Sequence, residues 1–124
     1  MIPINEISTP ALAYLGDCVI ELMVRSRLVE SGFSTSAHLN QEALAYVKAS
    51  AQAEAMERIL PLLSPEELSA YKRGRNSGHL NIPKSASPAQ YRMATGMETL
   101  FGYLHVTNNQ ARAEELFLAA YPIN

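Results

Sequence analysis

The sequence predicts an all-α domain, and two observations support this prediction. Helix start signals recur at Thr9-Pro10, Ser64-Pro65 and Ser87-Pro88, where a capping residue precedes proline, a residue well tolerated in the first helical turn. Between these signals apolar residues recur at helical spacing, and no segment shows the sustained alternation of a strand. We expect about six or seven helices of ordinary length.

Each expected helix follows from its own boundary signals. The first begins at Thr9-Pro10 and stops at Gly32, because glycine commonly follows a helix end. Ser64 and Glu67 have the spacing of a capping box, and Asn108 is a candidate cap for the last helix. The expected helical stretches are residues 9–32, 38–63 as two consecutive helices ending near Pro61, 64 onward, 89–106 and 110–121.

One segment, residues 74–88, is not expected to be helical, because it carries Gly, Asn, Ser and Pro throughout. Loops of this length in a compact domain are usually functional or disordered. The acid-free window from Ser69 to Met97 contains this loop and five of the ten Lys and Arg residues, although the formal net charge is −2. A local positive patch predicts a bound polyanion, and an exposed loop with solvated charges is the alternative.

Composition limits the class of protein. The chain has 124 residues, of which 48% are hydrophobic and 18% charged, so we expect one globular domain over residues 1–124. The single cysteine, Cys18, excludes an internal disulfide and is expected to be a small core residue. No apolar run approaches the ~20 residues of a membrane span, and no signal segment is recognisable. We therefore expect a cytoplasmic protein without a membrane partner.

An aspartate interrupts the apolar first helix. Asp17, the only aspartate in the chain, follows Gly16 within ALAYLGDCVIEL. On a helical wheel this helix is apolar nearly all round, which predicts a central helix packed on several sides. We expect its carboxylate to be partly desolvated, since its neighbours on the wheel are Ala13, Val24 and Leu28. An unpaired buried carboxylate costs several kcal/mol and a mid-helix glycine about 1 kcal/mol, so the charge needs a partner or a use.

A second isolated acid, Glu98, lies in the helix expected at residues 89–106 and is the only acid there. Gly96 and Gly102 lie in the same helix. Two central helices that pack closely at glycines would bring Asp17 and Glu98 together, and neighbouring carboxylates repel unless a proton or a cation lies between them. Carboxylates without nearby histidines favour a hard ion, Mg²⁺ or Mn²⁺, with water completing its shell.

A structural explanation of both acids stays open at this point. Asp17 could pair with Arg25, and Glu98 with Arg92 or Arg112, while the glycines serve helix packing alone. Other chemistry has less support, because the three histidines lack metal-ligand spacing. The sequence also has no Ser-His-Asp order, P-loop or dinucleotide fingerprint.

The two acidic helices resemble a known family. ALAYLGDCVIEL, residues 11–22, resembles the signature helix of the ribonuclease III catalytic domain, and ATGMETLFGYLH, residues 94–105, resembles its second acidic helix. The intervening YVKASAQAEAM and the YKRGRNSGH…PK loop resemble the mini-ribonuclease III subfamily, which has no double-stranded-RNA-binding domain. The resemblance spans nearly the whole chain.

The resemblance implies a ribonuclease III-like helical bundle that forms homodimers and cuts double-stranded RNA with Mg²⁺, or with Mn²⁺ as a substitute. It implies that Asp17 and Glu98 are the metal-binding and catalytic residues, and that the products carry 5′-phosphate and 3′-hydroxyl ends. The family usually matures the precursor of large-subunit ribosomal RNA, and a ribosomal protein is left open as a further partner. The residues expected to bind RNA are Lys72, Arg73, Arg75, Asn76, His79 and Lys84.

The chain departs from the larger ribonuclease III pattern at two positions. Where that pattern has an acid, this chain has Ala13, four residues before Asp17, and Thr95, three residues before Glu98. The number of metal ions per site therefore stays open, and water or phosphate oxygens are candidates for the absent ligands. Glu21, one turn after Asp17, is either an indirect contact to the ion or a structural residue.

Two functions other than the enzyme stay open. A reduced acid set could leave a non-cleaving double-stranded-RNA-binding protein of the same fold. Alternatively, a small helical interaction module could use the basic loop to bind an acidic protein. Turnover separates the first alternative from the enzyme, and an RNA-binding assay separates the second.

Overall fold

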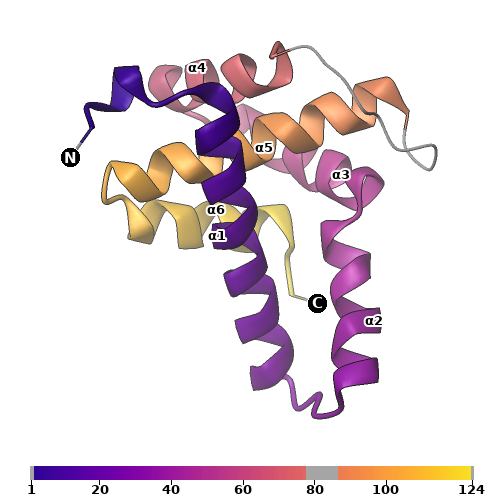
Figure 1. Ribbon diagram of the computed structural model, residues 1–124. Helices are drawn as coiled ribbons and strands as arrows, with labels where there is room; N and C mark the ends of the chain where they lie inside the picture. Colours follow the sequence, from indigo (N-terminus) through magenta and orange to yellow (C-terminus); the bar gives the residue numbers. More distant parts are fainter. Residues whose placement is uncertain (1, 78–86, 124) are drawn as a thin grey trace.

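The computed structural model describes residues 2–77 and 87–123, which form six α-helices, two short 3-10 helices and no strand (Figure 1). The predicted all-α class is confirmed. In chain order the elements are η1 (Ile4–Glu6), α1 (Thr9–Glu30), α2 (Ser36–Val47), α3 (Ala49–Ile59), η2 (Leu60–Leu62), α4 (Pro65–Arg75), α5 (Pro88–Val106) and α6 (Gln110–Ala120).

The predicted helix starts agree with the structure to within two residues. The capping box is present, because the Glu67 N–H donates to Ser64 Oγ at 3.2 Å and the Ser64 N–H donates to Glu67 Oε1 at 2.8 Å. Ser87 caps α5 by accepting a hydrogen bond from the Gln90 N–H at 3.2 Å. The cap of α1 is Ser8 rather than Thr9, because the Ser8 hydroxyl is the one that accepts a backbone N–H.

Two boundaries differ from the prediction. The residue before α6 is Asn109, whereas Asn108 takes a positive φ of 57° and makes the turn out of α5. The segment expected to be a loop from residue 74 starts later, because α4 continues to Arg75 and Asn76 is its C-cap. Residues 78–86 of that segment lie outside the described residues.

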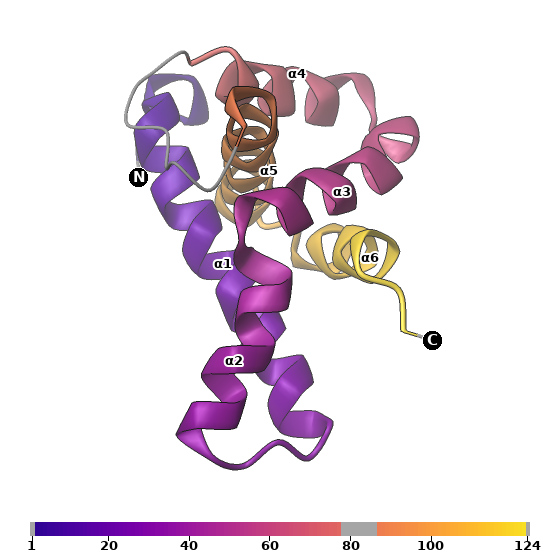
Figure 2. The ribbon, with the colours of Figure 1, turned by 90° about the vertical axis from the view of Figure 1, so that its right-hand side faces the viewer.

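Helix α5 is the centre of the molecule and packs against α1, α3, α4 and α6 (Figures 1 and 2). Its residues Met97, Leu100, Phe101 and Leu104 are fully buried. Each such side chain contributes roughly 1.5–3 kcal/mol to folding through removal of apolar surface from water. Within the described ranges, none of the helices is long and apolar enough to cross a membrane.

Helices α1 and α5 cross at two glycines, so that their backbones are in direct contact. A Cβ atom added at Gly16 would lie 1.6 Å from the Glu98 carbonyl oxygen, and one added at Gly102 would lie 2.0 Å from the Leu12 carbonyl oxygen. Both distances are far below van der Waals contact, so no larger side chain fits without separating the helices. The crossing therefore explains the mid-helix glycine beside Asp17.

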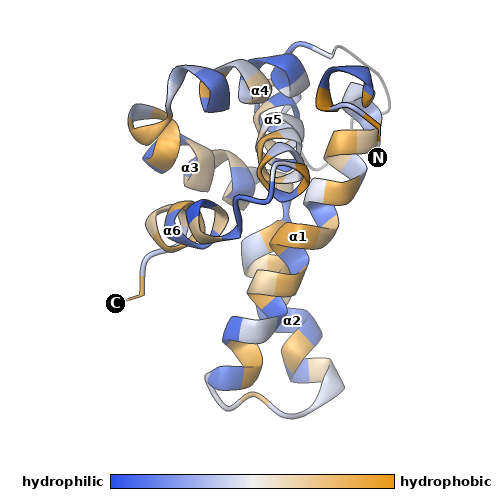
Figure 3. Cartoon of the chain, turned by 90° about the vertical axis from the view of Figure 1, so that its left-hand side faces the viewer, coloured by the Kyte–Doolittle hydropathy of each residue, from blue (hydrophilic) through white to orange (hydrophobic). Residues whose placement is uncertain are grey.

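Helix α1 packs mainly against α5, with smaller contacts to α2, α4 and α6, but one of its faces is exposed, so the expectation of a central helix is wrong. Tyr14, Leu22 and Val29 are 84%, 65% and 62% exposed. The C-terminal half of α1 and α2 form an arm that extends away from the other helices (Figures 1 and 2), and Figure 3 shows hydrophobic segments along α1. The helical wheel gave the apolar residues correctly, but only one side of α1 is covered by α5.

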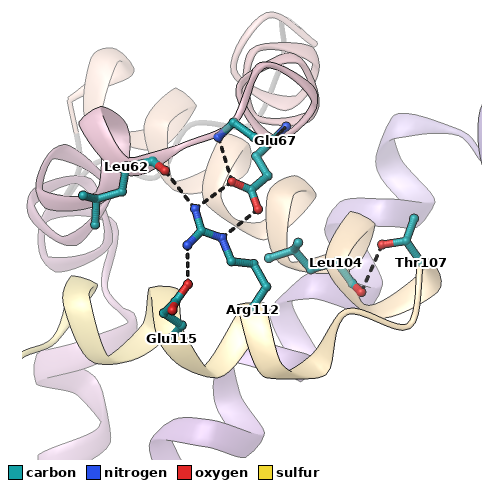
Figure 4. Close-up of polar contacts among 7 residues, drawn as sticks. Leu62, Glu67, Leu104, Thr107, Arg112 and Glu115 are labelled. Atoms are coloured by element: carbon teal, nitrogen blue, oxygen red, sulfur yellow. Dashed lines mark hydrogen bonds and ion pairs between the residues drawn. The ribbon is translucent and has the colours of Figure 1, made fainter.

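A partly buried ion pair joins the start of α4 to α6 (Figure 4), because Glu67 is buried while the Arg112 side chain is 26% exposed. Glu67 is only 6% exposed, and its carboxylate accepts hydrogen bonds from Arg112 Nε at 2.9 Å and Nη2 at 3.0 Å. The same guanidinium donates to the Leu62 carbonyl at 2.8 Å and pairs with Glu115. These bonds to Arg112 are the main cause that lowers the pKa of Glu67 below its usual 4.5, against the opposing effect of burial.

The ion pair predicts a stability that depends on pH. Because the pKa of Glu67 is lower in the folded state, its contribution is complete above pH 4.5 and is lost as the pH falls through the folded-state pKa. We expect Glu67→Gln to lower the free energy of unfolding at pH 7 by about 2 kcal/mol, since hydrogen bonds to charged groups contribute about that much. It should also flatten the stability profile below pH 5, as measured by urea unfolding.

The neighbouring Glu66→Gln is the matched control, because Glu66 lies in the same first turn of α4 but is exposed. We expect it to change stability by less than about 1 kcal/mol, the usual size of a charge effect at a helix end. Two results would contradict a stabilising role of the Glu67–Arg112 ion pair. One is an equal loss of unfolding free energy in both variants, and the other is an unchanged dependence of stability on pH below pH 5 in Glu67→Gln.

Candidate active site

The α1–α5 crossing brings Asp17 and Glu98 together. Asp17 follows Gly16 on α1, and Glu98 is the α5 residue whose carbonyl oxygen contacts Gly16. Burial is the main cause that raises the pKa of Glu98, to about 8, followed by the charge of Asp17 and a hydrogen bond between the two carboxyl groups. The two carboxyl groups therefore lie close together, and their interaction favours the protonated form of Glu98.

The surroundings of the two acids differ. Glu98 is half-buried, whereas Asp17 is exposed, so the expectation that Asp17 is partly desolvated is wrong. Asp17 stays outside because α5 covers the Gly16 side of α1 and leaves the next residue at the edge of the contact. It lines an open hollow of about 500 Å³ with Tyr14 and Cys18, among others. Cys18 is likewise exposed rather than a core residue.

Two of the basic side chains proposed as structural partners of the acids, Arg25 and Arg112, are engaged elsewhere. Arg25 pairs with Glu21 at 2.8 Å, one turn apart on α1, and both side chains line the hollow at Asp17. Arg112 pairs with Glu67 and Glu115. Within residues 2–77 and 87–123, neither Asp17 nor Glu98 forms an ion pair with a basic side chain, so pairing with Arg25, Arg92 or Arg112 does not explain them.

The carboxylate oxygens of Asp17 and Glu98 are ligands that suit a hard divalent cation. Carboxylate oxygens are the ligands that Mg²⁺ prefers, and a cation between two repelling carboxylates would favour the ionised form of both. No group of three or more Asp, Glu, His or Cys side chains that could hold a metal occurs among the described residues. An ion bound by Asp17 and Glu98 would therefore take its other ligands from water or from a substrate.

The C-terminal end of α4, which carries Lys72, Arg73 and Arg75, lies near Glu98. Ser77, just after the C-cap Asn76, lines a small pocket together with Glu98. Lys72 is exposed, and Arg75 lies over the Tyr71 ring with its Cζ 5.7 Å from the ring centre. Positive side chains therefore lie on the last turn of α4, and Ser77, just beyond that turn, lines the pocket at Glu98.

Among the predicted RNA-binding residues, Arg73 has an additional role that the sequence did not indicate. Its Nε donates to Thr9 Oγ1 at 2.7 Å, and its Nη2 donates to the Ile7 carbonyl. The guanidinium thus holds the start of α1 against α4, across more than sixty residues of sequence. Arg75 Nε donates to Asn76 Oδ1 at 3.1 Å.

The remaining predicted RNA-binding residues are His79 and Lys84, which lie outside the described residues. The sequence did not indicate the hydroxyl-bearing residues Thr9, Ser77 and Tyr91, which line the pocket at Glu98 together with Thr95. Thr9 and Ser77 come from elements other than that of Glu98, so no local pattern indicates them, whereas Tyr91 precedes Glu98 by two turns on α5.

The sequence of this chain is similar to the sequences of known ribonucleases. The sequence model of the Ribonuclease III domain matches residues 10–109. A protein named Mini-ribonuclease 3 from Symbiobacterium thermophilum is 42% identical over 118 residues, which cover 94% of this chain and 91% of that protein. Another Mini-ribonuclease 3, from Enterococcus faecalis, is 44% identical over 114 residues, covering 90% and 86%.

The fold is also shared with a solved structure. The crystal structure of protein FN1578 from Fusobacterium nucleatum superimposes with a TM-score of 0.84 at 27% identity, covering 91% of this chain and 92% of that chain. The resemblance seen in the two acidic helices and the ribonuclease III-like fold are both confirmed. The chain therefore belongs to the ribonuclease III family, in its mini-ribonuclease III group, and is a nuclease of that family.

Proposed function

We propose that this nuclease is a Mg²⁺-dependent endoribonuclease that cleaves double-stranded RNA, with Asp17 and Glu98 as its catalytic metal ligands. The observation that carries the proposal is the meeting of these two carboxylates at the α1–α5 crossing, with no basic partner for either among the residues described. A phosphodiester gripped by the basic end of α4 would lie close to them, because Ser77 lines the pocket at Glu98.

The cation and the two carboxylates would have different roles in cleavage. A cation between the carboxylates would supply Lewis acidity and a bound water of lowered pKa. Asp17 and Glu98 would hold that cation in their ionised forms and so fix its position. In-line attack of water on phosphorus, with the 3′ oxygen leaving, gives the proposed 5′-phosphate and 3′-hydroxyl ends.

The basic residues would bind the duplex through its backbone. Double-stranded RNA hides its base edges in a deep, narrow groove, so proteins recognise mainly its shape, phosphates and 2′-hydroxyls. Lys72 and Arg75 would contact phosphates, and the Asn76 side-chain amide would donate a hydrogen bond to a sugar or phosphate. Arg73 contributes both its charge and its hold on the start of α1.

We include a homodimer in the proposal. The exposed apolar face of α1 formed by Tyr14, Leu22 and Val29 is one that a second copy would cover, and Tyr14 and Leu22 also line the hollow at Asp17. Exposed apolar patches of this kind commonly mark protein interfaces. Two copies joined there would present two sites to one duplex and so cut both strands.

The biological role is proposed on the family resemblance alone. It implies maturation of the large-subunit ribosomal RNA precursor in the cytoplasm, and the participation of a ribosomal protein stays open. The non-cleaving RNA-binding alternative is kept because Ala13 and Thr95 stand where larger relatives have acids. The interaction-module alternative is disfavoured by the match to a nuclease family over most of the chain.

The direct test is cleavage of a long RNA duplex by the wild type, Asp17→Asn and Glu98→Gln, each with Mg²⁺ and with EDTA. We expect cleavage by the wild type only with Mg²⁺, and a loss on the order of 10³-fold in each variant, because several kcal/mol of charge stabilisation are removed. RNA binding in a gel shift should persist. Glu54→Gln, an exposed acid on α3, is the control and should cleave normally.

Binding of duplex by the wild type without cleavage in Mg²⁺ or Mn²⁺ would favour the non-cleaving alternative. Cleavage that persists in Asp17→Asn would remove Asp17 from the site.

The basic end of α4 is tested by the salt dependence of RNA binding. When one phosphate contact is lost, RNA binding releases fewer counterions. Lys72→Ala, Arg73→Ala and Arg75→Ala should therefore each weaken binding and reduce the slope of log K against log salt by about 1. Arg73→Ala should also lower the melting temperature, because its bonds to α1 are lost. Lys48→Ala, exposed between α2 and α3, is the control. An unchanged slope in Lys72→Ala and Arg75→Ala would exclude this segment.

A further inference from the structure

A pocket beside Glu98 joins the two positions at which larger ribonucleases III carry acids. Its volume is about 170 Å³, and it lies between the first turns of α1, the end of α4 and α5. The side chains that line it include Thr9, Ala13, Ser77, Tyr91, Thr95 and Glu98. Since a water molecule occupies about 30 Å³ in the liquid, the pocket has room for several.

The hydroxyl groups of Thr95 and Thr9 in this pocket have defined hydrogen bonds, and these bonds determine what each hydroxyl can still donate or accept. Thr95 Oγ1 donates its hydrogen to the Tyr91 carbonyl at 3.1 Å, so its oxygen is left to accept. Thr9 Oγ1 accepts from Arg73 Nε at 2.7 Å, so its hydrogen is left to donate. A hydroxyl has one donor and two acceptor positions, and the pocket therefore presents both kinds of partner to water.

The Thr95 hydroxyl oxygen is a suitable hydrogen-bond acceptor for a metal-bound water. Water on a divalent cation donates its hydrogens strongly, because the cation withdraws electron density from the oxygen. Mg²⁺ prefers six oxygens and keeps several waters, while Asp17 and Glu98 are its only expected protein ligands. Those waters need acceptors on the protein side, and Thr95 provides one within the pocket that Glu98 lines.

We propose that this pocket holds ordered water that completes the shell of the cation at Asp17 and Glu98, with Thr95 and Thr9 as positioning residues. Ala13 contributes by being small, because its methyl group leaves the space that the water fills. The inference rests on the proposed function, and it specifies that the ion is held as a largely hydrated ion rather than by four carboxylates. The site then carries less negative charge against an approaching phosphate.

The inference is tested by Mn²⁺ binding to the RNA-free chain, followed by the electron paramagnetic resonance signal of free Mn²⁺. Thr95→Val removes the hydroxyl and keeps the shape of the side chain. We expect its Mn²⁺ affinity to fall about tenfold, the lower end of the loss seen when partners of metal-bound groups are removed. Thr107→Val is the matched control, because Thr107 Oγ1 makes the same bond to the carbonyl four residues earlier, at 2.8 Å, but is exposed.

A second variant tests the space itself. Thr95→Asp puts a carboxylate into the pocket in place of water, next to Glu98. We expect about tenfold tighter Mn²⁺ binding, together with a lower melting temperature without metal, because three carboxylates then repel one another. Mn²⁺ should raise that melting temperature by more than it raises the wild-type value.

Asp17→Asn, titrated in parallel, separates failure of the inference from failure of the proposed function. If Asp17→Asn loses Mn²⁺ binding while Thr95→Val binds as tightly as Thr107→Val, the water-filled pocket is wrong and the two-carboxylate site stands. If Asp17→Asn binds Mn²⁺ as the wild type does, the proposed metal site is wrong and the inference falls with it.

Discussion

The backbone contact between α1 and α5 is the constraint on which the rest of the structure depends. Gly16 and Gly102 allow the two helices to touch, and an added Cβ at Gly16 would lie 1.6 Å from the Glu98 carbonyl oxygen. Because α5 also packs against α3, α4 and α6, the position of α1 relative to α5 fixes its position relative to the whole core. The same contact places Asp17 next to Glu98, so fold and candidate site share one determinant.

The structure shows two glutamates whose ionisation is shifted in opposite directions by their partners. Arg112 lowers the pKa of Glu67, and this pair stabilises the fold. Burial and then Asp17 raise the pKa of Glu98 to about 8, which costs stability as long as both groups are ionised. A fold that keeps such an unfavourable pair usually uses it, and a bound cation would turn the repulsion into binding energy. The chain belongs to a nuclease family, and we propose that it uses this pair to bind a cation.

Local patterns predicted most of the helices because their causes are local. The Ser64–Glu67 capping box involves residues within one turn, and the glycines beside the lone acids signalled a close helix crossing. Features that depend on distant partners were not predictable. The helical wheel did not show which side of α1 would be covered, so it buried Asp17 wrongly. Arg73 reaches Thr9 from another helix, which no periodicity in the sequence indicates.

The measurement that tests the central claim most directly is a carboxyl ¹³C NMR titration of Glu98 with and without saturating Mg²⁺, assigned by its loss in Glu98→Gln. The account predicts that the pKa of Glu98 is about 8 in the metal-free protein, because of burial and the Asp17 charge. With Mg²⁺ bound, the pKa should fall below neutrality, since the cation favours the ionised carboxylate. A Glu98 pKa near the ordinary 4.5 without metal, or one that Mg²⁺ leaves unchanged, would contradict the claim that these two acids form a cation site.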